Sequence, residues 1–131
     1  MDIIRRNTDY ALRAMAHLAI NYGREPISTR LIAESEDISY QLACKLMQKM
    51  NDAGLVSSIM GPKGGYFLSK EPSSINLLEI IEAVQGPLTV NRCLNEQETC
   101  PRKPYCPLSG KMKELQDYIT GFLSDLTLAG L

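Results

Sequence analysis

Apolar residues recur along the first part of the chain with the spacing of an amphipathic helix. In the segment TDYALRAMAHLAINY, residues 8–22, they stand three or four positions apart, which predicts a helix with one face toward a core. The predicted core-facing stripe consists of Leu12, Met15, Ala16 and Ala19. Asn7 or Thr8 is expected to cap the helix, Asp9 lies in its first turn, and Gly23 is expected to end it.

Two more amphipathic segments follow with little chain between them. Ser28 is expected to cap a helix of about nine residues in which Leu31 and Ile32 face inward. After a tight turn, Ser39 is expected to cap a second helix of about fourteen residues that stops at Gly54. A short helix, a tight turn and a longer helix together predict a helix-turn-helix.

The second of these helices has two unlike faces. One face is apolar and carries Leu42, Ala43, Leu46, Met47 and Met50. The opposite face carries Gln41, Cys44, Lys45 and Gln48, with Tyr40 and Lys49 at its edges. Glutamine pairs with base edges and lysine reaches guanine edges or phosphates, so this face has the chemistry of a helix that lies in the major groove of DNA. An ordinary solvated helix face is the alternative.

The segment LVSSIMGPKGGYFLSK, residues 55–70, predicts a strand, a turn and a second strand. The expected strand residues are Val56 and Ile59 in the first strand and Tyr66, Phe67 and Leu68 in the second. Lys63 lies near the tip of a glycine-rich turn, where Gly64 permits close approach to a phosphate backbone or minor groove. A hairpin directly after a helix-turn-helix predicts a winged helix-turn-helix over residues 1–70. The alternative is an ordinary hairpin with a solvated lysine.

A winged helix-turn-helix implies binding to double-stranded DNA. The residues expected to face the DNA are Ser28, Ser39, Tyr40, Gln41, Cys44, Lys45, Gln48, Lys49, Lys63 and Gly64.

Two helices are predicted in the second half of the chain. Ser73 or Ser74 leads into a connecting helix within residues 71–90, and Gly86 closes it. Residues 108–131 predict one long terminal helix with an apolar stripe of Leu108, Met112, Leu115, Ile119, Phe122, Leu123 and Leu126. Such a stripe commonly pairs with its symmetry mate, so we expect a homodimer on a palindromic operator. Packing of the helix onto its own domain alone is the alternative. The predicted fold class is mainly α with a small β-hairpin.

Composition narrows the possible functions. The chain has 131 residues, a net charge of −1 and one histidine. No apolar run is long enough for a signal peptide or a membrane span, so a cytoplasmic location without membrane contact is expected. One histidine, no nucleophile elbow and no phosphate-binding loop argue against an enzyme.

Three of the four cysteines lie close together in CLNEQETCPRKPYC, residues 93–106. Cys93, Cys100 and Cys106 stand among charged residues and prolines in a segment, residues 91–107, that predicts a loop. Clustered cysteines in a reducing compartment more often mean metal or redox chemistry than disulfides.

The sequence resembles a family of bacterial winged-helix regulators that includes IscR, NsrR, RirA and CymR. The residues that carry the resemblance are TDYALRAMAHLA (8–19), AGLVSS (53–58), GPKGGYFLSK (61–70), LLEIIEAVQG (77–86) and the three clustered cysteines. The resemblance implies a homodimeric repressor in which Cys93, Cys100 and Cys106 ligate a [2Fe–2S] or [4Fe–4S] cluster, and in which the cluster senses nitric oxide, oxygen, redox state or iron–sulfur status. A cluster-free regulator controlled through its thiols or a partner protein is the alternative.

The resemblance leaves the fourth cluster ligand open. Some members have a histidine after the third cysteine, but the segment CPLSGKMK here has none, and His17 is the only histidine. Some members use an aspartate of the first helix from the partner chain, and Asp9 matches that position. Asp9 as a ligand and Asp9 as a helix-capping carboxylate both stay open. Many relatives also carry an arginine before the wing turn, where this chain has Met60.

Overall fold

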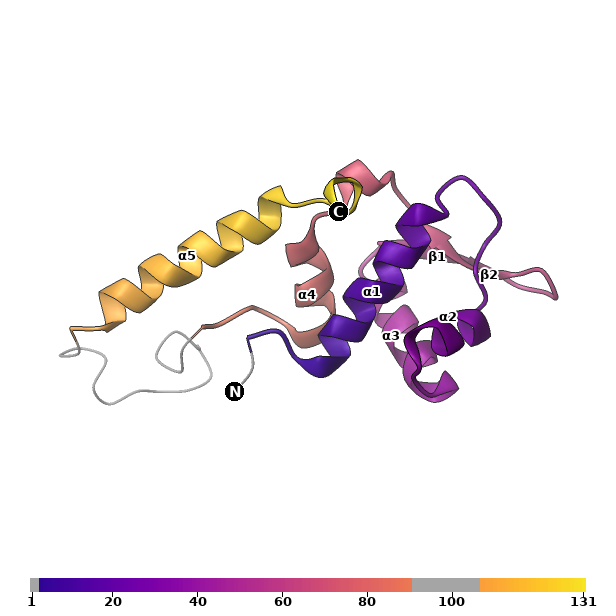
Figure 1. The fold of residues 1–131 in the computed structure, drawn as a ribbon, viewed down its shortest axis with the longest axis horizontal. Coiled ribbons are helices and arrows are strands. Elements are labelled where there is room, and N and C mark those ends of the chain that lie inside the picture. Colours follow the sequence, from indigo (N-terminus) through magenta and orange to yellow (C-terminus); the bar gives the residue numbers. More distant parts are fainter. Residues whose placement is uncertain (1–2, 91–106) are drawn as a thin grey trace.

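The computed structural model of the chain describes residues 3–90 and 107–131, so Cys93, Cys100 and Cys106 lie outside the described residues. The described part is mainly α-helical with one antiparallel hairpin (Figure 1), which confirms the predicted fold class. Its α-helices and strands are α1 (Arg6–Ile20), α2 (Thr29–Glu36), α3 (Tyr40–Asp52), β1 (Val56–Ile59), β2 (Gly65–Leu68), α4 (Leu77–Gln85) and α5 (Ser109–Asp125). Two short 3₁₀ turns, Pro72–Ser74 and Leu128–Gly130, complete it.

The helix-turn-helix forms as its sequence predicts. The hydroxyl oxygen of Ser28 accepts the N–H of Leu31 at 3.1 Å, and that of Ser39 accepts the N–H of Leu42 at 3.1 Å. Both serines therefore cap their helices and satisfy one otherwise free N–H each. Between the helices, Asp37 adopts a left-handed conformation with φ of 53° and turns the chain sharply. Only Leu31 departs from expectation, because its side chain is 48% exposed.

The first helix begins earlier and faces differently than predicted. It starts at Arg6, and its cap residue Arg5 makes no side-chain cap hydrogen bond. Thr8, one of the two expected caps, is instead completely buried, and its hydroxyl donates to Gln85 Oε1 at 2.7 Å. The buried residues of this helix are Thr8, Ala11, Ala14, Met15 and Leu18, so the core-facing stripe is rotated by about one position from the predicted one.

One main core joins the helix-turn-helix to segments far along the chain. Its fully buried large side chains include Met15, Ile32, Met47, Met50, Leu55, Ile75 and Ile80. Ile80 belongs to α4 and Leu128 to the C-terminal turn, so both packing partners come from outside the predicted DNA-binding segment. The predicted division of the chain into segments that end at residues 70, 90 and 107 stays a prediction. The main core contains residues from both sides of residue 70.

The hairpin has the predicted strands and a third, single-residue pairing at its base. Val56 pairs with Leu68, and Ile59 pairs with Gly65. Tyr66 on the outer side of β2 exchanges two backbone hydrogen bonds with Ile27, at 2.8 and 2.9 Å. This bridge fixes the hairpin against the start of α2, so the wing is anchored to the helix-turn-helix rather than free.

The fourth helix is capped by a residue that the sequence reading overlooked. Asn76, rather than Ser73 or Ser74, accepts the N–H of Glu79 at 2.9 Å, and the Glu79 carboxylate bonds the Asn76 backbone N–H in return. This reciprocal arrangement is a capping box, whose signature is a polar cap followed three residues later by glutamate.

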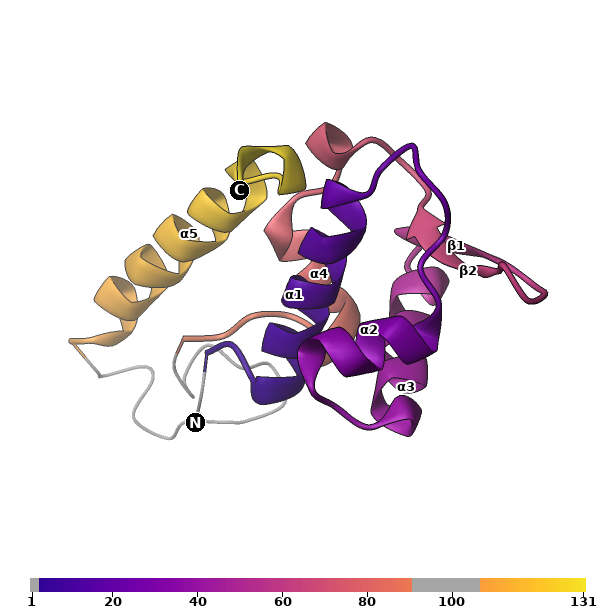
Figure 2. The same ribbon diagram turned by 45° about the vertical axis from the view of Figure 1, so that its right-hand side comes forward.

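The last helix is shorter than predicted. It ends at Asp125, and Leu126 is extended. The backbone then returns to the start of α4, where the carbonyl of Leu126 accepts the N–H of Leu77 at 2.9 Å and Leu128 donates to the carbonyl of Ile75 at 3.0 Å. These long-range bonds replace the helical ones. Figures 1 and 2 show α5 on the side of the molecule opposite the hairpin.

Candidate nucleic-acid interface

The outer side of α3 presents a polar surface to solvent. Gln41, Lys45 and Gln48 are exposed there, and we call these three residues the recognition face. Ala43, Leu46, Met47 and Met50 are buried on the opposite side, as the sequence predicts. The amide of Gln48 donates to the Asp52 carboxylate at 2.9 Å, which orients it along the helix. Gln41 and Lys45 are the two members that no neighbouring side chain holds among the described residues.

The edge of α3 nearest the hairpin carries an aromatic and thiol cluster. The guanidinium carbon of Arg30 lies 5.5 Å from the centre of the Tyr40 ring, a cation–π distance. A hydrogen bond with the half-buried Cys44 raises the pKa of the Tyr40 phenol above its ordinary value. Burial, followed by the influence of Cys44, raises the pKa of Tyr66 on β2. The cluster therefore joins α2, α3 and the wing.

A groove of about 370 Å³ lies between this cluster and the wing. We call it the wing groove, and it is lined by Ser28, Thr29, Arg30, Tyr40, Ser58, Ile59, Met60, Gly61, Gly64, Gly65 and Tyr66. Lys63 is exposed in the turn beyond it, and Met60 is 92% exposed. The capped start of α2, a cationic side chain and the wing thus converge on one hollow, which suits a nucleic-acid backbone.

Two glycines let the wing approach its neighbours closely. A Cβ on Gly64 would lie 2.0 Å from the carbonyl oxygen of Ile59, and one on Gly65 would lie 2.3 Å from the carbonyl oxygen of Ile27. Gly65 also has a φ of 152°. The structure therefore explains Gly64 by the packing of the turn itself, whereas its expected contact with DNA stays a prediction.

Lys49 occupies the other edge of α3. Its ammonium donates to the carbonyl oxygen of Val84 at 3.1 Å, at the end of α4. The side chain is half-buried, in contrast to the exposed Lys45 one turn earlier. Its predicted contact with DNA stays a prediction, and its observed partner is the protein.

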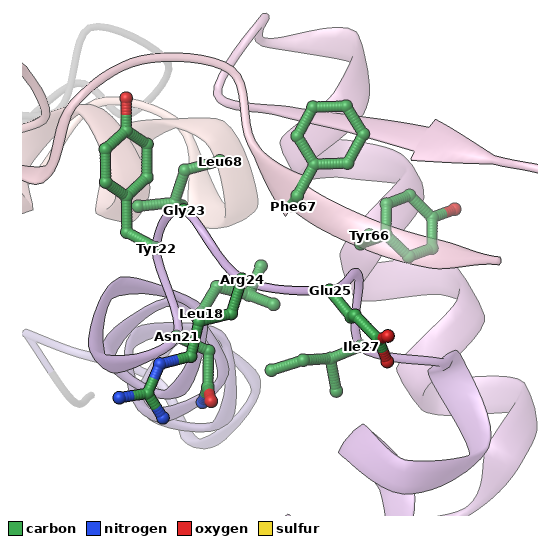
Figure 3. Close-up of a pocket in the computed structure, with 10 residues that line it drawn as sticks. All are labelled: Leu18, Asn21, Tyr22, Gly23, Arg24, Glu25, Ile27, Tyr66, Phe67 and Leu68. Carbon is green, nitrogen blue, oxygen red and sulfur yellow. The ribbon is translucent and has the colours of Figure 1, made fainter. Parts of the chain in front are cut away.

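A second hollow lies behind the wing, away from the recognition face. Its volume is about 320 Å³, and buried Leu18, Ile27 and Leu68 line it (Figure 3). Figure 3 shows Tyr22 just after the end of α1 and Phe67 on β2, on opposite sides of the residues that line it. None of the residues predicted to contact DNA lines this hollow, and Tyr66 borders both this hollow and the wing groove. The hollow lies between the end of α1, the loop that follows it and β2.

Comparison with known proteins identifies the family. The family model of the Rrf2 proteins, described as iron-dependent transcriptional regulators, matches residues 4–131. The chain belongs to the Rrf2 family. This confirms the resemblance drawn from the sequence and the winged-helix fold.

Curated relatives and solved structures agree with this assignment. The transcriptional regulator IscR of Escherichia coli is 36% identical over 122 residues, which cover 93% of this chain and 75% of IscR. The cysteine regulator CymR of B. subtilis has a TM-score of 0.79 and 30% identity, with 99% of this chain and 95% of CymR covered. IscR of T. potens has a TM-score of 0.78 and 28% identity, with 97% and 83% covered. This Rrf2 protein is therefore a DNA-binding transcriptional regulator and not an enzyme, as its sequence predicts.

The structure does not test the predicted cluster ligands, because Cys93, Cys100 and Cys106 lie outside the described residues. Asp9 lies in the first turn of α1 with its side chain half-exposed, and its carboxylate accepts the Arg13 guanidinium at 3.0 Å. Within residues 3–90 and 107–131, no three metal-ligating side chains come together. Nor does this part of the chain contain a helix with the length and apolar character that crossing a membrane requires.

The sequence analysis overlooked one residue of this surface and one residue that holds the start of α1. Arg30 is absent from the predicted contacts, because its place over Tyr40 depends on how α2 packs against α3. Gln85 was not assigned a role from the sequence either, yet it accepts a hydrogen bond from Thr8, which lies 77 residues earlier in the chain. Arg30 could have been found from its place in the first helical turn after the Ser28 cap. No local feature of the sequence marks Gln85.

Proposed function

We propose that this chain is a homodimeric repressor that binds a palindromic operator and whose affinity for DNA depends on an iron–sulfur cluster. The observation that carries the proposal is the recognition face beside the wing groove in a chain of the Rrf2 family. A repressor of this kind acts by occupying its operator. If Asp9 of the partner chain holds the cluster, loss of that bond would alter the spacing of the two DNA-reading units and release the operator.

Four residues have distinct roles in DNA binding in this proposal. Gln41 reads a base edge and Lys45 reaches a guanine edge or a phosphate, because both side chains are exposed and unrestrained. Arg30, which lines the wing groove, and Lys63, which is exposed in the turn beyond it, meet phosphates. Met60 carries no charge, so the wing of this protein does not insert a cation at that position.

The chemistry of the available donors fits an iron–sulfur cluster. Three thiolates from Cys93, Cys100 and Cys106 are the standard ligand type, and the exposed carboxylate of Asp9 from the partner chain is our proposed fourth ligand. When bound, the cluster supplies a redox-active iron centre that can exchange a ligand with nitric oxide or oxygen. A carboxylate binds more weakly than a thiolate, so the Asp9 position is where exchange is easiest.

The residues that flank the cysteine segment on both sides are attached to α5, which supports the proposed placement of a cluster beside that helix. The backbone N–H of Val90 donates to Gln116 Oε1 of α5 at 3.2 Å, and Pro107 leads directly into α5 at Ser109. Both ends of the segment are therefore attached to α5. A cluster held between them would sit beside the helix through which we propose that the protein dimerises.

The dimer interface in this proposal is the apolar side of α5. Only Leu123 of this 17-residue helix is buried, while Leu115, Tyr118 and Phe122 are 44%, 74% and 59% exposed. Ile3 and Ile4 extend the same surface and line an apolar hollow of about 500 Å³ with α5. A second copy of the chain is the occupant we propose, because a two-fold regulator matches a two-fold operator.

Anaerobic purification tests the cluster directly. We expect brown protein whose visible absorption accompanies stoichiometric iron and sulfide, and replacement of Cys100 by serine should abolish both. Cys44→Ser is the matched control, because Cys44 lies on α3 among Tyr40 and Tyr66 and should leave the spectrum unchanged. Colourless protein that takes up no iron and sulfide under anaerobic reconstitution would remove the cluster from the proposal and leave the DNA-binding function standing.

A cluster-free regulator controlled through its thiols is the second candidate. The observation that favours it is the likeness to the cysteine regulator CymR, whose TM-score of 0.79 is the same within 0.01 as that of the IscR structure. Reversible oxidation of Cys93, Cys100 or Cys106 would then replace cluster chemistry. Thiol titration before and after mild peroxide treatment, together with DNA affinity, separates the two candidates.

A further inference from the structure

A basic hollow lies beside the recognition face, at the start of α1. Its volume is about 330 Å³. We call it the arm pocket, and it is lined by Arg5, Arg6, Asn7, Thr8, Lys49, Val84 and Gln85. Three of these seven residues are cationic and none is anionic, so the hollow suits a negatively charged group.

The two arginines of the arm pocket are available to a ligand. Both side chains are exposed, and within the described residues neither guanidinium takes part in an ion pair. Lys49, in contrast, is held at Val84 and contributes its charge from a fixed position. One planar guanidinium group can donate hydrogen bonds to two phosphate oxygens at once, which makes arginine well suited to bind a phosphodiester.

The arm that carries these arginines is held by one side chain of α4. Gln85 Oε1 accepts the N–H of Arg5 at 3.1 Å and the hydroxyl of Thr8 at 2.7 Å, and its amide nitrogen donates to the carbonyl of Ile3 at 2.8 Å. Two of these hydrogen bonds hold the backbone of the arm, at Ile3 and Arg5, and the third holds the Thr8 side chain. A fixed backbone lowers the entropy lost when Arg5 and Arg6 bind a ligand.

The position of the arm pocket relative to α3 points to the ligand. At 100° per residue, Lys49 lies about 40° around the helix from Lys45, on the side away from Tyr40 and Cys44. The wing groove therefore borders one edge of the recognition face, and the arm pocket borders the other. A helix in the major groove has a phosphate backbone on each side, roughly 12 Å apart.

We propose that the arm pocket binds a phosphodiester of the DNA strand that lies across the major groove from the strand met by the wing groove. Arg5 and Arg6 contact the phosphate, and Gln85 positions them. This inference rests on the proposed DNA-binding surface of α3. It assigns to the arm a contact that is independent of base sequence, whereas Gln41 reads bases.

Salt titration of duplex binding tests the arm pocket without knowledge of the operator. A random 30-base-pair duplex serves as the probe, and the variants are Arg5→Gln, Arg6→Gln and the double variant. We expect the slope of log affinity against log salt concentration to fall by about 0.9 for each lost phosphate contact. Arg24→Gln is the matched control, because it removes one exposed arginine from the hollow behind the wing at the far end of α1 (Figure 3).

The results separate this inference from the function on which it rests. Unchanged slopes in the double variant, with wild-type duplex binding intact and melting temperatures equal, would overturn the arm pocket alone. Absence of duplex binding by the wild-type protein at low salt would overturn the DNA-binding surface with it. Stabilisation of the wild-type protein but not the double variant by inorganic phosphate, with unchanged duplex slopes, would assign the pocket to a free anion instead.

Discussion

The ammonium of Lys49 lies 3.1 Å from the carbonyl oxygen of Val84. The contact joins the last turns of two helices, since Lys49 belongs to α3 and Val84 to α4. Carbonyl groups in the last turn of a helix lack partners within that helix, so a lysine there satisfies a group that would otherwise be unpaired. The bond also ties the DNA-reading helix to a helix that ends six residues before the cysteine segment begins.

Replacement of Lys49 by methionine should destabilise the protein. Methionine keeps the apolar stem but removes the ammonium, which leaves the partly buried Val84 carbonyl without its bond, so we expect the free energy of unfolding to fall by about 1 kcal/mol. Urea denaturation measures this loss of unfolding free energy. Lys45→Met is the control, because exposed Lys45 has no protein partner within residues 3–90 and 107–131. Its loss should weaken duplex binding while changing stability by less than about 0.5 kcal/mol. Equal stability of the two variants would refute the role of the bond.

Gly65 should tolerate no side chain. A Cβ at this position would lie 2.3 Å from the Ile27 carbonyl, and the backbone φ of 152° is itself unfavourable for other residues. We expect Gly65→Ala to cost about 2 kcal/mol or more and to weaken duplex binding, because the wing must move away from the start of α2. Thermal unfolding and duplex affinity check both effects.

Gly61→Ala is the comparison for the wing variant. Gly61 also has a positive φ, of 109°, but a Cβ there would meet no atom within 4 Å. Backbone strain alone should therefore cost about 1 kcal/mol, with the base of the wing still paired to Ile27. If Gly61→Ala and Gly65→Ala were equally destabilising, the close approach at Ile27 would not be what requires glycine.

Local chemistry made much of the fold predictable from the sequence. Ser28 and Ser39 each bond an N–H three residues ahead, so their caps are readable from a few neighbouring positions. The apolar face of α3 repeats at the helical period over about two and a half turns, and all four of its fully buried members were foreseen. Asn76 could have been foreseen too, because Glu79 completes a capping-box signature.

The mistaken predictions involve residues whose partners are distant in the chain. Thr8 has the chemistry of a helix cap, but the bond to Gln85 places it in the interior instead. Leu126 continues the apolar stripe of α5, yet its carbonyl bonds Leu77 and ends the helix. Arg30 gains its place over Tyr40 only when two helices pack. Helix propensity and apolar periodicity contain no information about such tertiary contacts. Where the two conflict, the tertiary contacts decide the structure.

Asp9 and Arg13 provide a matched pair for testing the fourth cluster ligand. Their exposed ion pair, at 3.0 Å, should contribute less than about 0.5 kcal/mol to stability, so Asp9→Ala and Arg13→Ala should unfold at similar denaturant concentrations. If Asp9 ligates the cluster of the partner chain, only Asp9→Ala should change the visible spectrum and speed cluster loss in air. Anaerobic absorption spectra measure this difference. Identical spectra for both variants would limit Asp9 to its ion pair and its place at the start of the helix.

The apolar side of α5 should govern the oligomeric state. Phe122 is 59% exposed and lines the hollow formed with Ile3, Ile4 and Tyr118, so we expect Phe122→Asp to place a charge in the dimer interface. Burial of an unpaired carboxylate is costly, and dimer affinity should fall by at least about tenfold. Sedimentation across a range of protein concentrations measures the change.

Ile20→Asp is the control for the interface variant, because Ile20 is 77% exposed at the end of α1 and lies outside that hollow. It should leave the dimer intact, whereas Phe122→Asp should also weaken binding to an operator more than to a single half-site, since two linked heads bind with a higher effective concentration. A wild-type protein that sediments as a monomer at micromolar concentration, or a Phe122→Asp variant that stays dimeric, would show that α5 is not the interface.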